Sequence, residues 1–230
     1  MDYQKLLEQG RNFIFIGEAG CGKSEIALNL AAALLKEQDR PVEFFDLDMT
    51  KPLFRSRDVA DSVRALGIDV HYEEQFRDSP TLTGGVEPAM KDPERIAILD
   101  VGGDYIGART LGVYLPFIMR PDTMVFFIVN PYRPWSLDID HIDGVLGEVL
   151  GVSHIPLSKV TFVGNPNLGL RTDVAEVLEG IRRLKASVEE YVPIAFFGVR
   201  EEIAEDVSKE CDGMEIMPLT LYLTYPWEDN

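Results

Sequence analysis

The sequence predicts an α/β protein with three layers, in which a mostly parallel β-sheet lies between two layers of helices. Short, continuous apolar runs alternate along the chain with longer helix-favouring stretches, which is the pattern of buried parallel strands joined by crossover helices. The 230 residues are 46% hydrophobic and 27% charged, values typical of a globular protein with a sizeable core. With no repeat and no low-complexity linker, we expect one domain over residues 1–230.

Each expected element follows from its local pattern. Apolar runs bounded by polar or turn-forming residues predict strands at 12–16, 42–48, 68–72, 95–100, 123–130, 160–163, 192–198 and, at an edge, 215–217. Helix-favouring stretches predict helices at 23–36, 58–66, 139–150, 173–190 and 201–209. Residues 73–86 are polar and rich in turn formers, so we expect an active-site loop there.

Residues 17–24 read Gly-Glu-Ala-Gly-Cys-Gly-Lys-Ser, a complete GxxxxGK[ST] pattern between the first strand and the first helix. Its glycines let the backbone curl, so that consecutive N–H groups and the helix N-terminus face phosphate oxygens. Lys23 reaches the β- and γ-phosphates, and the Ser24 hydroxyl ligates Mg²⁺. The expected nucleotide-binding residues here are Gly17, Glu18, Ala19, Gly20, Cys21, Gly22, Lys23 and Ser24. The motif predicts a nucleoside triphosphate site and the P-loop NTPase fold.

A second motif follows the strand at 95–100. Apolar residues lead into Asp100, as in the Walker B pattern, and Gly103 completes a DxxG spacing. We expect Asp100 to hold Mg²⁺ directly or through water, and the Gly103 amide to contact the γ-phosphate.

Two carboxylates, Asp46 and Asp48, stand at the end of the strand at 42–48. Residues two apart in a strand project to the same side, and two close acids repel unless a cation or a polarised water lies beside them. We expect Asp46 to contribute to the Mg²⁺ shell. Asp48 is the candidate to orient the attacking water, so Asp48 and Lys23 are the expected catalytic residues.

Asn165 follows the strand at 160–163, and its side-chain amide offers both a donor and an acceptor to a purine edge. The guanine-specific pattern Asn-Lys-x-Asp is absent, because the residues after Asn165 are Pro166, Asn167 and Leu168. Without a carboxylate for the guanine N1–H and N2–H₂ donors, adenine is favoured. An ordinary turn role for Asn165 stays open.

Net charge, cysteine content and the length of the apolar runs limit the partners and the compartment that we expect. The formal net charge of −17 opposes binding to nucleic acid or to an anionic membrane. Two cysteines, Cys21 and Cys211, allow no disulfide framework and no CxxC metal pair, which indicates a reducing compartment. No apolar run approaches the roughly 20 residues that span a bilayer, and the N-terminus has no signal-peptide pattern. We expect a cytoplasmic protein.

These motifs together resemble the MinD/ParA/CobQ/CobB branch of the SIMIBI class of P-loop NTPases, over most of residues 12–200. The matching features are the loop at 17–24, Asp46-Leu47-Asp48, the Asp100–Gly103 segment, Asn130-Pro131 at a strand end, and Asn165. The resemblance implies an ATPase that requires Mg²⁺. It also implies a largely parallel sheet and either ATP-driven dimerisation or docking on a partner protein.

One position departs from the family pattern. The family carries a lysine where this chain has Glu18, and that lysine reaches across a dimer to the partner's phosphates. We therefore do not expect an ATP-driven sandwich dimer, and the oligomeric state stays open. Another cation must then neutralise the transition-state charge, and Arg55, Arg57 and Arg109 are candidates by position.

Three functions remain open at this point. The first is an ATPase switch that acts on a protein partner, for which the aromatic and arginine-containing stretch 130–135 is a candidate contact. The second is an ATP-dependent ligase or synthetase of the CobQ/CobB/dethiobiotin-synthetase kind, with residues 73–86 lining a substrate pocket. The third is a nucleotide-binding regulator with little turnover.

Overall fold

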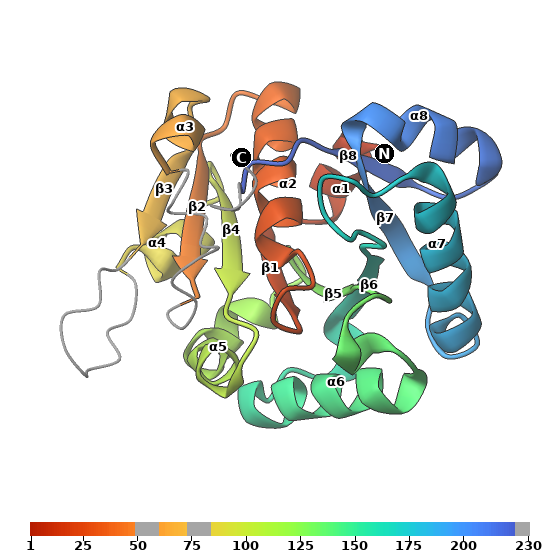
Figure 1. Ribbon diagram of the computed structural model, residues 1–230. Coiled ribbons are helices and arrows are strands. Elements are labelled where there is room, and N and C mark those ends of the chain that lie inside the picture. Colours follow the sequence, from red (N-terminus) through yellow and green to blue (C-terminus); the bar gives the residue numbers. More distant parts are fainter. Residues whose placement is uncertain (49–59, 73–83, 224–230) are drawn as a thin grey trace.

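The computed structural model describes residues 1–48, 60–72 and 84–223. The centre of the fold is an eight-stranded sheet with the order β3-β2-β4-β1-β5-β6-β7-β8 (Figure 1). Every pairing between neighbouring strands is parallel, so the expected mostly parallel sheet is confirmed. The strands are β1 Asn12–Gly17, β2 Val42–Leu47, β3 Asp69–Tyr72, β4 Ile96–Val101, β5 Thr123–Val129, β6 Val160–Gly164, β7 Ile194–Arg200 and β8 Ile216–Leu219. All the predicted strands are present, with small shifts at their ends.

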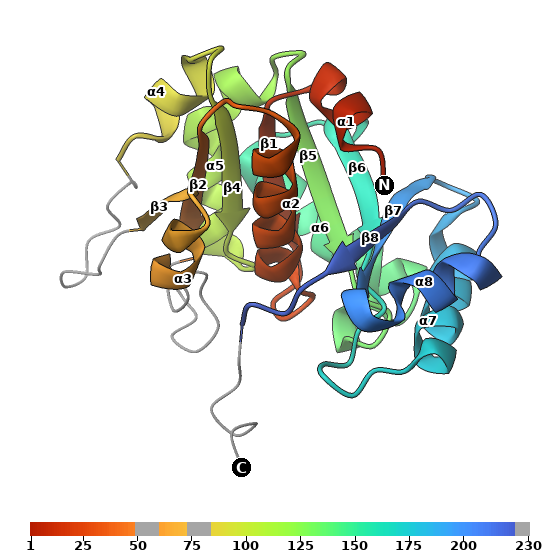
Figure 2. The ribbon, with the colours of Figure 1, turned by 90° about the horizontal axis from the view of Figure 1, so that it is seen from above.

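Helices cover both faces of the sheet (Figure 2). They are α1 Tyr3–Gln9, α2 Lys23–Glu37, α3 Ala60–Ala65, α4 Val86–Lys91, α5 Tyr105–Ile118, α6 Ile139–Ser153, α7 Val174–Val188 and α8 Glu201–Glu210, with 3₁₀ turns η2 Pro134–Ser136 and η3 Leu157–Lys159. One hydrophobic core lies under α1, α2 and α3, and a second lies under α4 to α8. The three-layer α/β prediction is confirmed.

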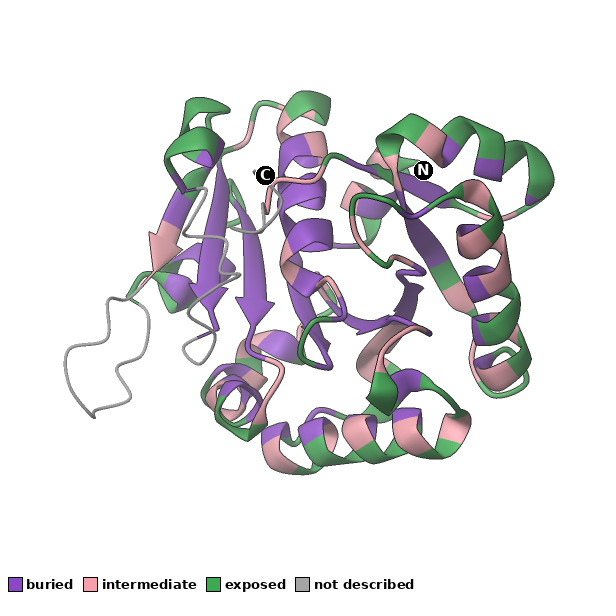
Figure 3. Ribbon diagram, viewed as in Figure 1, coloured by how far each residue is buried: buried purple, intermediate pink, exposed green. Residues whose placement is uncertain are grey.

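The strands read as continuous apolar runs because both of their faces are covered. In β1, Phe13 and Phe15 enter the core under α2, whereas Ile14 and Ile16 enter the core on the opposite face. All four side chains are buried, as Figure 3 shows for the central strands. Since β1 lies between β4 and β5, the carboxyl ends of the central strands meet at one edge, where the site is built.

Helices α1, α4 and α5 were not predicted from the sequence. Gly107, Gly112 and Pro116 lie within α5 and lower its intrinsic helix propensity. The helix forms because Asp104 caps its N-terminus by accepting from the Gly107 N–H, and because Leu111 is buried in the core. Tertiary packing here outweighs local propensity.

Parts of three expectations fall outside the described residues. The helix expected at 58–66 appears as α3 from Ala60, and residues 49–59 lie outside the description. Of the loop expected at 73–86, residues 73–83 lie outside it, and Val86 begins α4. Arg55 and Arg57 also lie outside it. Across the described ranges, no helix combines the length and apolar character needed to cross a membrane.

Candidate functional site

The loop between β1 and α2 adopts a conformation that requires glycine. Gly17, Gly20 and Gly22 have φ of 138°, 78° and 95°, in the region that side chains other than glycine rarely adopt. A Cβ at Gly17 would also lie 2.5 Å from the Ile128 carbonyl oxygen in β5. The loop is therefore held tightly against the sheet, with α2 starting at Lys23.

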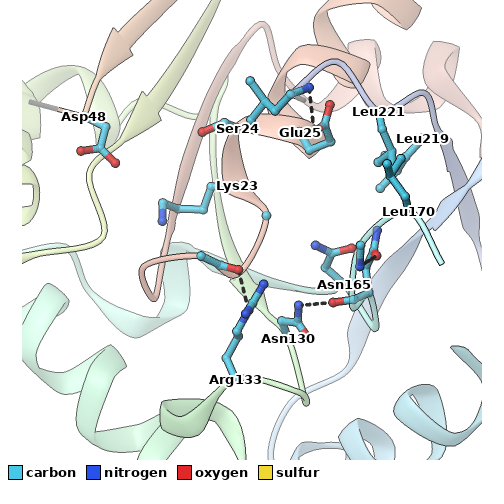
Figure 4. Close-up of a pocket in the computed structure, with 15 residues that line it drawn as sticks. Lys23, Ser24, Glu25, Asp48, Asn130, Arg133, Asn165, Leu170, Leu219 and Leu221 are labelled. Atoms are coloured by element: carbon cyan, nitrogen blue, oxygen red, sulfur yellow. Dashed lines mark hydrogen bonds between the residues drawn. The ribbon is translucent and has the colours of Figure 1, made fainter. Parts of the chain in front are cut away.

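Lys23 turns back over this loop. Its Nζ donates to the Glu18 carbonyl oxygen at 2.9 Å, and its side chain is almost fully buried. Lys23, Ser24 and Asp48 line the same cavity (Figure 4). A fixed ammonium at the mouth of a glycine-rich loop is a suitable partner for phosphate oxygens.

Three buried carboxylates meet beside Lys23. The register of β2 and β4 pairs Asp46 with Asp100, and Asp46 Oδ1 accepts from the Asp48 N–H at 3.0 Å. Burial, followed by repulsion from Asp46, raises the pKa of Asp100 to about 7, while Lys23 and the Ser24 hydroxyl oppose this rise. The structure thus brings together Asp46, Asp100 and Ser24, the three residues expected to hold Mg²⁺, and their role as metal ligands stays a prediction.

The donor set fits Mg²⁺. Hydroxyl and carboxylate oxygens are the ligands that this ion prefers. A divalent cation would offset both the burial of the Asp100 carboxylate and its repulsion by Asp46. Within the described residues, no three acidic, histidine or cysteine side chains form a ready metal cage. Such a sparse set suits Mg²⁺, which is commonly held by one or two carboxylates together with substrate phosphates and water.

The segment after β4 rests directly on the loop. A Cβ at Gly103 would lie 2.6 Å from the Ala19 backbone nitrogen, and a Cβ at Gly102 would lie 3.2 Å from Asp48 Oδ1. Gly103 therefore packs directly on the loop, two residues before α5 begins at Tyr105.

Asn165 lies against the opposite side of the loop. Its Nδ2 donates to the Cys21 carbonyl oxygen at 2.7 Å. Its Oδ1 is buried and has no hydrogen-bond partner among the described residues. Asn130 Nδ2 donates to the Asn167 carbonyl oxygen at 2.8 Å, which ties the loops after β5 and β6 together. One half of the Asn165 amide thus supports the loop, and ligand binding by the other half stays a prediction.

Leucines complete this end of the cavity. Leu170, Leu219, Leu221 and Leu223 line it, and Figure 4 shows Leu219 and Asn165 across the cavity from Lys23 and Asp48. Apolar walls with a few amides suit a flat heterocyclic base.

The segment after β8 is fastened to α2. Glu25 accepts from the backbone N–H groups of Tyr222 and Leu223, and Asn29 exchanges two hydrogen bonds of 2.8 Å with the backbone of Thr220. Burial raises the pKa of Glu25 to about 7, against the lowering effect of the two backbone donors. Glu25 and this segment were not predicted as part of the site, because no local sequence pattern links residues so far apart.

Arg133 is a further residue that the sequence analysis did not place in the site. It precedes η2, and its Nε donates to the Gly20 carbonyl oxygen at 2.8 Å at the tip of the loop. Arg109, proposed as a substitute cation, is exposed on α5 and is not among the residues that line this cavity. The stretch 130–135 is predicted from the sequence as a partner contact, and the arginine within it is the signal that could have pointed to the loop.

Glu18 turns away from Lys23 and towards η2. Its Oε2 accepts from Ser136 Oγ at 3.0 Å and its Oε1 from the Trp135 N–H at 3.4 Å, and the side chain is buried. The backbone of Glu18 stays in the loop, but its carboxylate belongs to a second cavity on the other side.

The sequence and the structure were compared with known proteins. No protein-family model and no curated protein matches the sequence. Among solved structures, chloroplast FtsY from Physcomitrella patens is 16% identical with a TM-score of 0.54, over 84% of this chain and 59% of that one. FlhF complexed with GTP and Mg²⁺ is 10% identical with a TM-score of 0.51, over 85% of this chain and 69% of that one.

Cell division protein FtsY from Thermotoga maritima is 16% identical with a TM-score of 0.48, over 83% of this chain. This chain spans 57–62% of the length of the first FtsY structures that it matches. The fold is the α/β P-loop NTPase fold, as in the chloroplast FtsY and FlhF structures. At these identities the likeness establishes the fold alone, and the MinD/ParA-like subtype stays a prediction.

Proposed function

We propose that this protein binds a Mg²⁺–nucleoside triphosphate, hydrolyses it slowly, and acts as a nucleotide-dependent switch on a partner protein. The grouping of Lys23, Ser24, Asp46 and Asp100 around the glycine loop carries this proposal. These residues come from the start of α2 and from the ends of β2 and β4, and their closeness supports the proposed phosphate and metal contacts.

Each residue has a proposed role. Ser24 and Asp100 hold Mg²⁺ directly or through water, with Asp46 in the shell, and the ion would neutralise charge on the β- and γ-phosphates. Lys23 contacts the same phosphates, and Asp48, which lies beside Gly102, orients the attacking water.

We further propose that the base is adenine. The buried Oδ1 of Asn165 is an acceptor without a partner, so it matches the exocyclic amino group of adenine and opposes the guanine O6. This specificity differs from that of FlhF, whose structure contains GTP.

The switch rests on contacts between the two loops. Gly103 packs on Ala19, so a phosphate that orders the loop also orders the segment leading into α5. Hydrolysis would release that segment, and a protein partner would then meet a changed surface.

A competition titration tests the nucleotide and the base together. We expect a fluorescent ATP analogue to bind with Mg²⁺ and to be displaced by ATP at least about fivefold more readily than by GTP, because unpaired guanine donors cost roughly 1–3 kcal/mol. EDTA provides the metal control. Tighter GTP binding would overturn the adenine assignment, and no nucleotide binding would overturn the whole proposal.

A further inference from the structure

A second cavity of about 640 Å³ lies between the start of α5 and α6, beside η2. The two helices pack side by side below the sheet in Figure 1. Its walls include Glu18 and Ala19 of the phosphate loop, and Gly103 of the segment that rests on that loop. It shares no lining residue with the nucleotide cavity, so it is a separate site that contacts the same loop.

The residues that line this cavity favour a ligand with a positively charged end and an apolar stem. Asp104, Asp140 and Glu148 line it together with Glu18, and no lysine or arginine is among its lining residues. The floor is apolar and includes Val149. A carboxylate rim above an apolar floor matches the extended side chain of lysine or arginine.

Aromatic side chains stand at the entrance. Trp135 and Tyr105 are 60% and 52% exposed although they are large and apolar, and their ring faces attract cations. Close to them in sequence, Ile106 and Leu137 are 51% and 61% exposed. Exposed apolar residues around a charged cavity are typical of a protein interface in which one side chain is the central anchor. A small ligand inside the cavity would leave such residues exposed to water.

We propose that this cavity is the docking site for a basic side chain, lysine or arginine, of a protein partner. The proposal rests on the switch function, whose partner it describes by its chemistry. Because Glu18 and Gly103 belong both to this cavity and to the nucleotide machinery, docking here is coupled to the state of the phosphate loop.

Peptide binding to the full-length protein tests this assignment. The probe is a fluorescein-labelled peptide of alternating leucine and arginine, measured by anisotropy beside the same peptide with glutamate in place of arginine. The double variant Asp140→Asn/Glu148→Gln removes two exposed carboxylates from the cavity. The matched control Glu205→Gln/Asp206→Asn removes two exposed carboxylates from α8.

We expect saturable binding of the arginine peptide, weakened about fivefold by the cavity variant and less than about twofold by the α8 variant. An equal effect of both variants would mean general attraction to an acidic surface and would overturn the proposal, as would absence of saturable binding. Displacement by spermine at an equal concentration would assign the cavity to a polyamine instead of a protein.

A parallel titration separates this inference from the proposed function. The Asp140→Asn/Glu148→Gln variant is expected to bind Mg-ATP as tightly as the wild type, because neither residue lines the nucleotide cavity. Absence of Mg-ATP binding in the wild type would remove the proposed function. Normal nucleotide binding with unchanged peptide binding in the cavity variant would remove only the docking site.

Discussion

Three buried carboxylates and one ammonium set the electrostatics of the proposed phosphate site. Asp46, Asp48 and Asp100 are each less than a tenth exposed, and so is Lys23. Lys23 offsets only part of the burial and mutual repulsion of these carboxylates, so the pKa of Asp100 stays raised and a further cation would be stabilising. The same groups are expected to respond differently to single substitutions.

Lys23→Ala should weaken Mg-ATP binding sharply while the fold persists. The charge-assisted contacts of Lys23 with phosphate are worth roughly 2–3 kcal/mol, or about 30- to 150-fold in affinity. Isothermal titration calorimetry measures the loss, and thermal unfolding checks the fold. Lys36→Ala, which removes an exposed lysine from the same helix, is the matched control. Wild-type affinity in Lys23→Ala would show that the loop assignment is wrong.

Asp100→Ala and Asp48→Asn should separate metal binding from water orientation. We expect Asp100→Ala to lower the Mg²⁺-dependent part of the affinity, and Asp48→Asn to slow turnover while binding is preserved. Titrations with and without Mg²⁺, paired with phosphate-release rates, distinguish the two. Equal losses of binding would make Asp48 a metal ligand.

Arg133→Ala should loosen the tip of the phosphate loop. Removing the donor to the Gly20 carbonyl oxygen is expected to cost about 1 kcal/mol, or about fivefold in Mg-ATP affinity. Arg133→Lys should recover part of the loss, since lysine keeps the charge but lacks the planar fork. Arg171→Ala, an exposed arginine that does not line the cavity, is the control. Unchanged affinity in Arg133→Ala would contradict a role in the loop.

At the scale of elements, the site depends on close approaches between backbones. The turn after β4 lies against the loop after β1 because Gly103 has no side chain, and α5 starts from that turn under the cap of Asp104. This contact links the proposed nucleotide site to a helix that also forms a wall of the second cavity.

Gly103→Ala is therefore expected to displace the two loops and weaken nucleotide binding about tenfold or more, because its Cβ would meet backbone atoms of Glu18 and Ala19 below 3 Å. Calorimetry with Mg-ATP measures the effect. In α6, Gly147 faces open space, so Gly147→Ala should leave binding unchanged and stabilise the fold by roughly 0.5–1 kcal/mol. Similar affinities for Gly103→Ala and the wild type would argue against the coupling.

At the scale of the whole molecule, Glu18 bears on assembly. Its carboxylate is held by Ser136 and the Trp135 N–H, on the side of the loop away from Lys23. An acidic group there offers no positive charge to the phosphates of a second copy.

We therefore expect that Mg-ATP does not drive a closed dimer, and that any dimer is independent of nucleotide. Light scattering of Asp48→Asn with and without Mg-ATP tests this, with Lys23→Ala as the control that should not respond to ATP. A monomer-to-dimer shift on adding ATP would refute the prediction.

The sheet and the phosphate loop were predictable because their signals are local. Continuous apolar runs such as 123–130 reflect burial on both faces, and the GxxxxGK[ST] spacing at 17–24 is set by the backbone geometry of one loop. The helix α5 was not predictable from propensity, since its glycines and Pro116 oppose helix while core packing favours it.

By itself, the sequence determined the class of fold and the glycine-rich loop between β1 and α2. It did so because strand, loop and helix signals lie within a few residues of one another. Only the tertiary structure decided the contacts of Arg133 with Gly20, of Glu25 with the segment after β8, and of Glu18 with η2. These partners are more than a hundred residues apart in the chain. Their meeting depends on the order of the strands and the path of the crossovers, which no local pattern encodes.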